Sequence, residues 1–345
     1  MNLCVLLGGP SAEREISLLS GYGMARALQS HGHEVTLLDP ATNRAMKLEA
    51  FQAAPASKDA PSVTELGQYS QGGMLLESLM SKTVKSADAV VIGLHGLPGE
   101  DGLVQSVLEL LDKPFTGSGS RASALCIDKH YTKIILKDAG IPVPNGIIVP
   151  ASSHPQERHA AYQLAKTELG IPMVIKPNDQ GSTVGLTILK EDSEDAFLRA
   201  VDLALEYSGK ALIEECIEGR ELTVGILGNE ALPIVEITTK DGFYDYHHKY
   251  TPGMSLHVCP AEIQSEIADG IQSDALKAFK ACGCSGYARI DFRLRPDGSY
   301  YCLEINTLPG MTELSLLPDA ARAAGISFEE LCKRIVSETV RPKLG

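Results

Sequence analysis

The stretch that decides the fold is RIDFRLRPDGSYYCLEIN, residues 289–306. Its central Asp-Gly pair is a strong signal for the turn of a β-hairpin. A loop centred there pairs Asp291 with Glu304 and Arg289 with Asn306. Because side chains alternate along a strand, these four project from one face of the hairpin. Four apolar side chains are predicted on the opposite, core-facing side: Phe292, Leu294, Leu303 and Ile305.

The polar face of this hairpin offers two carboxylates and an amide oxygen from Asp291, Glu304 and Asn306. Hard oxygen ligands of this kind suit Mg²⁺, which binds one or two carboxylates together with substrate phosphates. The alternative is a solvated face with cross-strand charge pairs. Asp opposite Glu, however, is a like-charge pair that destabilises a plain sheet. A bound cation removes that conflict, so the sequence favours a metal site.

A second motif, KPNDQGSTVG at residues 176–185, lies between two predicted strands. Its glycines free backbone N–H groups to hold a phosphate, and Ser182 and Thr183 add hydroxyl donors. Lys176 places a positive charge beside the loop. The motif is not a Walker A loop, which needs GK[ST] at the start of a helix. An ordinary glycine-rich hairpin is the alternative.

Composition bounds the class of protein. The 345 residues suggest two or three domains, and a net charge of −13 makes nucleic acid an improbable partner. No apolar run approaches the ~18 residues of a membrane span, and the first residues are typical of a β-strand rather than a signal peptide. We therefore expect a cytoplasmic protein that binds neither nucleic acid nor membrane.

Eight cysteines are scattered along the chain, several of them in apolar stretches. Without an export signal they are most simply reduced core residues. The pair Cys282 and Cys284 could bind a metal, but only two ligands are in sight.

Strand-like and helix-like segments alternate from the N-terminus, which indicates α/β layers in three blocks. Residues 40–85 lack clear periodicity and are interpreted as an insertion, partly helical around Leu75–Lys85. The turn Gly8-Gly9-Pro10-Ser11 lacks the full G-x-G-x-x-G pattern, so a nicotinamide-binding domain is a weak alternative. The predicted strands are Leu3–Leu7, Glu34–Leu38, Ala89–Leu94, Met173–Lys176, Leu186–Leu189, Ala211–Glu215, Glu221–Leu227, Leu232–Ile237, Tyr287–Leu294 and Tyr300–Asn306.

Seven motifs, in this order along the chain, resemble the ATP-grasp enzymes and specifically the D-alanine–D-alanine ligase family. They are GGPSAEREIS (8–17), HGLPGEDG (95–102), GSG (117–119) with Asp128-Lys129, residues 176–185, YDYHHKY (244–250) with Cys259-Pro260-Ala261, Arg289 to Asp291, and EINTLPGMT (304–312). The resemblance implies an α/β ATP-grasp fold of three domains. They would be a Rossmann-like N-terminal domain (1–128, with the insertion at about 40–85), a central domain (129–213) and a C-terminal domain (214–345), the last two gripping ATP.

The resemblance also implies how ATP is held. Lys129 and Lys176 would contact its phosphates beside the loop Gly181, Ser182 and Thr183, with Lys249 at the γ-phosphate. The adenine and ribose would be bound by Glu214, Glu215, Ile217 and Glu221. Two Mg²⁺ ions, or Mn²⁺ in their place, would be held by Asp291, Glu304 and Asn306. Arg293 departs from the family, which places an apolar residue near the adenine.

For the amino-acid substrates the resemblance implies a further set of contacts. Glu13 would hold the ammonium of the first D-alanine in a network with Ser182 and Tyr250. Arg289 and the Gly310 N–H would stabilise developing negative charge, with His95 at the edge of the substrate site. Ser315 and the Leu316 N–H would bind the carboxylate of the second substrate.

The implied reaction joins two D-alanine molecules through an acyl phosphate and releases ADP and phosphate, for peptidoglycan precursor synthesis. A ligase joining D-alanine to D-lactate or D-serine is an alternative, and so is a regulatory protein that binds nucleotide without chemistry. The intact polar set Glu13, Lys249, Arg289 and Asn306 speaks against the regulatory protein. Members of the family are commonly homodimers, so a homodimer is expected.

Overall fold

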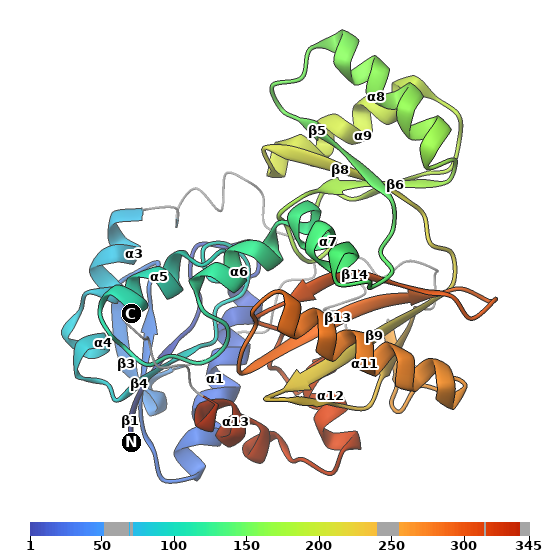
Figure 1. The fold of residues 1–345 in the computed structure, drawn as a ribbon. Coiled ribbons are helices and arrows are strands. Elements are labelled where there is room, and N and C mark those ends of the chain that lie inside the picture. The colour runs from blue at the N-terminus through green and yellow to red at the C-terminus, as the bar shows by residue number, and fades with distance from the viewer. Residues whose placement is uncertain (52–68, 70–71, 240–254, 314, 339–345) are drawn as a thin grey trace.

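The computed structural model describes residues 1–51, 69, 72–239, 255–313 and 315–338. Three β-sheets, each with its own helices, account for this part of the chain (Figure 1). The central sheet and its two helices stand apart as a lobe at the top of Figure 1, above the other two sheets. The domain boundaries given above stay a prediction.

The N-terminal sheet has the order β3-β2-β1-β4, with β1 parallel to β2 and β4. Its strands are β1 (Asn2–Leu6), β2 (Glu34–Asp39), β3 (Arg44–Lys47) and β4 (Ala89–Ile92). The helices of this region are α1 (Arg14–Ser30), the short 3₁₀ helix η1 (Leu48–Ala50), α3 (Gly72–Leu79), α4 (Lys82–Ser86), α5 (Leu103–Leu110) and α6 (Ser120–Ile127). Part of the segment interpreted as an insertion is thus the antiparallel edge strand β3. Four residues, two of them charged, carry too short a pattern to reveal it.

The central sheet is antiparallel, with the order β5-β8-β6-β7. Its elements are α7 (Lys129–Asp138), β5 (Gly146–Pro150), α8 (Pro155–Glu168), β6 (Met173–Pro177), β7 (Thr187–Leu189), α9 (Glu194–Tyr207) and β8 (Lys210–Glu215). Tyr162 of α8 and Phe197 of α9 pack with Ile175 and Ile213 in one buried cluster. Because side chains alternate, Lys176 and Glu214 project from the face that these helices leave uncovered.

The C-terminal sheet has the order β12-β11-β9-β13-β14, with β10 beside β9. Its elements are β9 (Arg220–Leu227), β10 (Glu230–Ala231), β11 (Val235–Thr239), β12 (Ser255–Val258), α11 (Ser265–Ala281), β13 (Tyr287–Leu294), β14 (Tyr300–Asn306), α12 (Leu316–Ala323) and α13 (Phe328–Ser337). Ile290 and Phe292 of β13 pack with α11 residues on one face. On the other face Gly225, paired with Arg289, lies against Leu317 of α12, where a Cβ would meet Leu317 at 2.6 Å. The helix α11 and the polar residues of β13 therefore lie on opposite sides of the sheet.

The hairpin of β13 and β14 has the predicted pairing at its polar end but not near its turn. Asp291 pairs with Glu304, whereas Phe292 pairs with Cys302, so Leu303 is the extra residue of a β-bulge. Cys302 is consequently buried, and Leu303, predicted in the core, is only half-buried. The prediction for Leu303 was wrong because the loop between the strands, residues 295–299, has five residues and shifts the pairing near the turn by one position. The bulge at Leu303 removes this shift, so Asp291 and Glu304 are paired as predicted.

The first and third sheets are joined through a shared core. Leu331 and Ile335 of α13 belong to the same buried cluster as Leu3 and Leu28, and α13 packs against α1. In the same way Leu136 of α7 belongs to the cluster under the C-terminal sheet. The C-terminal sheet is thus anchored to the N-terminal sheet and to α7, which both precede the central lobe in the chain. The strands β5 and β12 are not among the strands that the sequence predicted.

Candidate active site

The polar hairpin face, defined as Arg289, Asp291, Glu304 and Asn306, is assembled by the pairing of β13 with β14. The Arg289 guanidinium donates from Nε and Nη2 to the two oxygens of Asp291, both at 2.9 Å. Thr223 of β9, the cross-strand partner of Asp291, donates its hydroxyl to Asp291 Oδ1 at 2.6 Å. These bonds fix the orientation of the Asp291 carboxylate on the sheet.

Lys129 connects this face to the glycine-rich loop 178–185. Its Nζ lies 3.2 Å from Glu304 Oε2 and donates to the carbonyl oxygen of Gln180 at 2.7 Å. The N-terminus of α7 is held in place by Asn178, whose carbonyl oxygen accepts from the Lys129 N–H at 3.1 Å. The side chain of Lys129 is only 6% exposed, so water screens its charge little. A negatively charged ligand between the hairpin and the loop would therefore be strongly attracted to it.

A lysine cluster, defined as Lys133, Lys176 and Glu214, lies on the uncovered face of the central sheet. Lys176 Nζ is 2.8 Å from Glu214 Oε2, and Lys133 contacts the other oxygen of the same carboxylate. Two lysine side chains therefore share one buried carboxylate. Burial, reinforced by the charge of Lys176, lowers the pKa of Lys133 well below its usual value. A bound anion would stabilise the charged forms of both lysines. Lys133 was missed from the sequence, although it follows Lys129 by one helical turn and thus lies on the same face of α7.

The electrostatic environment of Lys176 is unusual. Burial lowers the pKa of its ammonium to about 8, with the nearby Glu304 carboxylate opposing the shift and Lys129 adding to it. A polyphosphate bound beside this lysine would stabilise its charged form. The uncovered face of the central sheet therefore resembles a site prepared for a highly charged anion.

The glycine-rich loop adopts a strained backbone where it approaches the N-terminal region. Ser182 and Thr183 have positive φ angles of 50° and 65°, a conformation that a β-branched residue rarely adopts. The Ser182 hydroxyl donates to a carboxylate oxygen of Glu13, and Gly181 also lies beside that carboxylate. The structure thus brings Glu13 together with Gly181 and Ser182. The role of Glu13 and Ser182 in binding the first substrate stays a prediction.

His95 lies at the edge of this region and is buried. Its Nδ1 is 2.9 Å from the Leu308 carbonyl oxygen and its Nε2 is 2.9 Å from the Ser20 hydroxyl. Burial lowers the pKa of His95, so its neutral form is favoured. Both ring nitrogens are thus engaged, and His95 positions the loop before Gly310. The neighbouring Glu100 carboxyl has its pKa raised to about 8 by burial and by the charge of Glu13.

The segment after β14 brings Gly310 next to the start of α12. Ser315 is the N-cap residue of α12, and its hydroxyl accepts from the Thr312 N–H at 3.0 Å. A Cβ at Gly310 would lie 2.8 Å from Ser315 Oγ, so only glycine fits there without a shift. Leu316 begins the helix, where backbone N–H groups and the helix dipole favour a carboxylate.

The residues predicted for adenine and ribose lie at the end of β8 and the start of β9. Glu215 Oε1 accepts from the Asn145 N–H at 3.2 Å, and Ile217 is buried. Glu221 pairs across the sheet with Arg293, whose Nη1 is 3.7 Å from Glu221 Oε2. Arg293 also donates to the Gly219 carbonyl oxygen at 2.9 Å. Arg293, which stands where the family places an apolar residue, therefore holds a positive charge beside Glu221.

The donor set of the polar hairpin face fits Mg²⁺. Asp291 and Glu304 supply carboxylates and Asn306 an amide oxygen from two adjacent strands, and phosphate oxygens of a substrate would complete the shell. In the described part of the chain no group of three or more His, Cys, Asp and Glu could hold a metal ion. Lys249 and Tyr250 lie outside the described residues.

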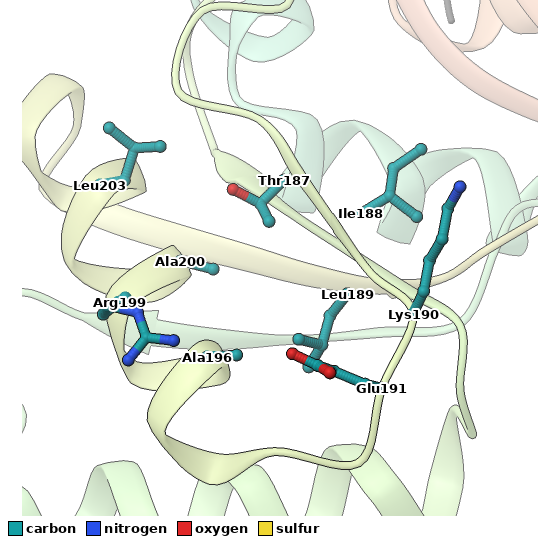
Figure 2. Close-up of a pocket in the computed structure, with 9 residues that line it drawn as sticks. All are labelled: Thr187, Ile188, Leu189, Lys190, Glu191, Ala196, Arg199, Ala200 and Leu203. Atoms are coloured by element: carbon teal, nitrogen blue, oxygen red, sulfur yellow. The ribbon is translucent and has the colours of Figure 1, made fainter. Parts of the chain in front are cut away.

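One pocket lies between β7 and α9, and its volume is about 460 Å³. Figure 2 shows the side chains that line it, among them Leu189, Lys190 and Arg199. None of the residues predicted for catalysis or binding lines it. Two of its labelled side chains, Lys190 and Glu191, carry opposite charges, and the cavity has no concentrated sign of charge to attract a polyphosphate. We therefore place the candidate active site between the central and C-terminal sheets and not in the pocket between β7 and α9.

Comparison with known proteins identifies the family. A family model described as "D-ala D-ala ligase N-terminus" matches residues 2–118, and one described as "D-ala D-ala ligase C-terminus" matches residues 135–337. The chain belongs to the D-alanine–D-alanine ligase family. This confirms the resemblance drawn from the seven motifs.

Individual members of the D-alanine–D-alanine ligase family match almost end to end. The D-alanine–D-alanine ligase of Desulforamulus reducens is 41% identical over 97% of both chains, and that of Halalkalibacterium halodurans is 38% identical over 99% of this chain and 100% of its own. The crystal structure of the Bacillus anthracis ligase superposes with a TM-score of 0.77 at 31% identity and covers 98% of this chain and 97% of that one. A structure of that ligase complexed with ATP gives a TM-score of 0.76. The predicted ATP-grasp α/β fold is thereby confirmed. None of the helices in the described part of the chain combines the length and apolar character that a membrane crossing requires.

Proposed function

We propose that this chain joins two D-alanine molecules to D-alanyl-D-alanine at the expense of ATP, releasing ADP and phosphate, and so supplies peptidoglycan precursor. The observation that carries the proposal is the opposition of two charged surfaces. The lysine cluster and Lys129 offer buried positive charge, and the polar hairpin face offers carboxylates at 3.2 Å from Lys129. A nucleotide triphosphate with Mg²⁺ satisfies both surfaces at once.

In this proposal ATP lies between the uncovered face of the central sheet and the hairpin. Lys129 and Lys176 bind its phosphates, and the loop of Gly181, Ser182 and Thr183 covers them. Glu215, Ile217 and Glu221 bind the adenine and ribose. Glu214, already held by two lysines, orients those ammonium groups and meets the adenine at the end of β8. Lys249 would reach the γ-phosphate.

Asp291, Glu304 and Asn306 would hold Mg²⁺, or Mn²⁺ in its place. When bound, the metal supplies charge neutralisation for the transferred phosphoryl group. Arg289, held on Asp291 by two hydrogen bonds, would stabilise the negative charge that develops on the reacting groups. These side chains are already positioned before substrate binds. They can therefore stabilise the transition state with little reorganisation of the protein.

The first D-alanine would be bound by its ammonium at Glu13, with Ser182 and Tyr250 in the same network. Its carboxylate attacks the γ-phosphorus of ATP, and ADP leaves. The amine of the second D-alanine then attacks the acyl carbon of the resulting acyl phosphate, and phosphate leaves. Gly310 N–H and Arg289 stabilise the tetrahedral oxyanion, while Ser315 and the Leu316 N–H hold the second carboxylate and His95 fixes the loop between them.

A phosphate-release assay with ATP, Mg²⁺ and a panel of amino and hydroxy acids tests the proposal. We expect release to require D-alanine and the dipeptide to form in equal amount. Equal turnover with L-alanine, or none with D-alanine, would refute it. Preferred use of D-lactate or D-serine as acceptor would establish the alternative ligase, and nucleotide binding without turnover would establish the regulatory protein.

We further propose a cytoplasmic homodimer. The cytoplasm is where ATP is available to the reaction. Apolar side chains are exposed on neighbouring helices, Leu76 and Met80 near α3 and Leu103 and Leu110 on α5, and a second copy of the chain would cover them. Light scattering on the purified protein at micromolar concentration should give twice the monomer mass. Leu110→Glu, at the most exposed of these positions, should shift that mass toward the monomer.

A further inference from the structure

Three cysteines from distant parts of the chain meet behind the polar hairpin face. Cys126 lies on α6, whereas Cys282 and Cys284 lie at the C-terminal end of α11. The Sγ atoms of Cys126 and Cys284 are 3.5 Å apart, across 158 positions of sequence. Cys126 is also hydrogen-bonded to Cys282. All eight cysteines of the chain are present as free thiols.

The backbone at the end of α11 holds this arrangement. The Cys284 N–H donates to the Phe279 carbonyl oxygen at 2.9 Å, and Gly283 between the two cysteines has a φ of 68°. That turn directs both thiols of the Cys-x-Cys pair toward α6. Cys126 and Cys282 are 2% and 4% exposed, whereas Cys284 is half-buried and is therefore the thiol that a small oxidant reaches first.

A metal site is the other function of clustered thiols. Within the residues that the structure describes, no group of three or more His, Cys, Asp and Glu has an arrangement that could hold a metal ion. Two thiols in direct contact are, in contrast, the starting geometry for a disulfide. The hydrogen bond from Cys126 lowers the pKa of the Cys282 thiol, so the third thiol is available to exchange with such a bond.

We propose that Cys126 and Cys284 form a peroxide-sensitive thiol pair that closes to a disulfide between α6 and the end of α11. The Cys284 thiolate attacks a peroxide oxygen and becomes a sulfenic acid, while the other oxygen leaves as water or an alcohol. The Cys126 sulfur then attacks the Cys284 sulfur, and the sulfenic oxygen leaves as water with the Cys126 proton. Two thiols and one peroxide thus give one disulfide, and a thiol reductant reverses the step.

The disulfide would act on the nucleotide site through α6 and α7. A disulfide brings its sulfurs to about 2.05 Å, so the present 3.5 Å separation must shorten. Cys126 precedes Lys129 by three residues, and Lys129 connects Glu304 to the glycine-rich loop. Misplacement of a positioning group by about 1 Å can cost up to 100-fold in rate. We expect about a tenfold fall in kcat/KM for ATP on oxidation, an effect that rests on the proposed function.

The disulfide itself is tested without any activity measurement. The purified full-length chain is treated with hydrogen peroxide, its remaining thiols are alkylated, and its peptides are mapped without reduction. We expect a Cys126–Cys284 linked peptide in the wild type and in the Cys259→Ser control, whose half-buried thiol donates to the Pro233 carbonyl oxygen. Cys284→Ser should give no linked peptide. Recovery of both thiols fully alkylated, or conversion of Cys284 to sulfinic acid without a link, would overturn the proposal, as would stoichiometric zinc binding that protects all three thiols.

The effect on ATP use is measured on the same samples. Peroxide should lower kcat/KM in the wild type and the Cys259→Ser control, a thiol reductant should restore it, and Cys284→Ser should be insensitive. An equal loss in Cys284→Ser would refute the link to the nucleotide site. Absence of ligase activity in untreated protein would instead refute the proposed function and leave the mapped disulfide as the test of the thiol pair.

Discussion

The polar hairpin face and the lysine cluster are two halves of one site, yet they are held in different ways. Glu304 on the hairpin is 27% exposed, and its neighbours are fixed by strand pairing and by hydrogen bonds within the same sheet. Glu214 in the lysine cluster is 3% exposed and is fixed by two ammonium groups from different elements. The partly exposed carboxylates of the hairpin can change their partners for a metal ion and substrate. The buried carboxylate of the lysine cluster cannot, because its two lysine partners are part of the folded structure. Substitutions should therefore affect catalysis at the hairpin and stability at the cluster.

The largest expected effect is that of Glu214→Gln. It leaves Lys133 and Lys176 buried without a carboxylate, which typically costs about 3–5 kcal/mol of unfolding free energy. The loss should be smaller at pH 9 than at pH 7, because Lys176, with a pKa of about 8, can then lose its charge. Denaturant titration at both pH values measures this.

Glu215→Gln is the matched control for that prediction. Glu215 is the next residue, half-buried, and lies 3.8 Å from Arg295. We expect a loss below about 1 kcal/mol, as for other partly solvated ion pairs. Equal losses in the two variants would contradict the view that buried charge in the lysine cluster is structural.

The next effect is that of Glu304→Gln on turnover. Removing a metal-binding carboxylate should lower the rate of phosphate release by about 100- to 1000-fold, with the unfolding free energy little changed. The fall should be steepest at limiting Mg²⁺. Glu230→Gln on the exposed strand β10 serves as control and should keep full activity. Near-normal activity of Glu304→Gln at limiting Mg²⁺ would show that the hairpin carries no metal.

The pH dependence of ATP binding distinguishes the two surfaces further. Above pH 8 the ATP-free protein loses the charge on Lys176, so its affinity for ATP should fall by up to about tenfold per pH unit. Stability changes in the opposite sense, since the unfolded chain binds more protons at this lysine between pH 8 and 10.5. Loss of binding above pH 8 is therefore not a consequence of unfolding.

Lys176→Arg should abolish this decline because a guanidinium stays charged throughout the range. The exposed Lys190→Arg is the matched control and should leave the decline unchanged. Titration of ATP by calorimetry from pH 7 to 9.5 gives the comparison. A decline of equal slope in Lys176→Arg would assign the titration to another group.

The smallest effect is expected for Arg293→Leu. Arg293 lies 3.7 Å from Glu221 and donates to Gly219, so its removal takes one positive charge away from the Glu221 carboxylate beside the predicted ribose site. Partly solvated pairs at this separation contribute little, and KM for ATP should change by less than about threefold. A larger rise in KM would mean that the guanidinium itself contacts the nucleotide.

The hairpin face was predictable from the sequence because it depends on local rules. A turn signal and a period of two are enough to oppose Asp291 and Glu304. The bulge at Leu303 was not predictable, since it follows from the length of the connection before β14. The wrong prediction therefore affected only which side chain of β14 enters the core, Cys302 instead of Leu303.

The lysine cluster was only partly predictable. Lys176 and Glu214 were found one by one from their motifs, but their contact requires β6 and β8 to be neighbours, which is a tertiary fact. Lys133 had a usable signal, its position one turn after Lys129 on α7. The contact of Cys126 with Cys284 had none, because it joins parts of the chain 158 positions apart.

The most direct test of the account is isotope transfer in the ligation reaction. D-Alanine labelled with ¹⁸O in its carboxylate is incubated with ATP, Mg²⁺ and the purified chain, and the released phosphate is analysed by mass spectrometry. If the carboxylate attacks the γ-phosphate at the site between hairpin and lysine cluster, each dipeptide formed delivers one ¹⁸O atom to phosphate. Unlabelled phosphate accompanying dipeptide formation, or phosphate release without dipeptide, would contradict the account.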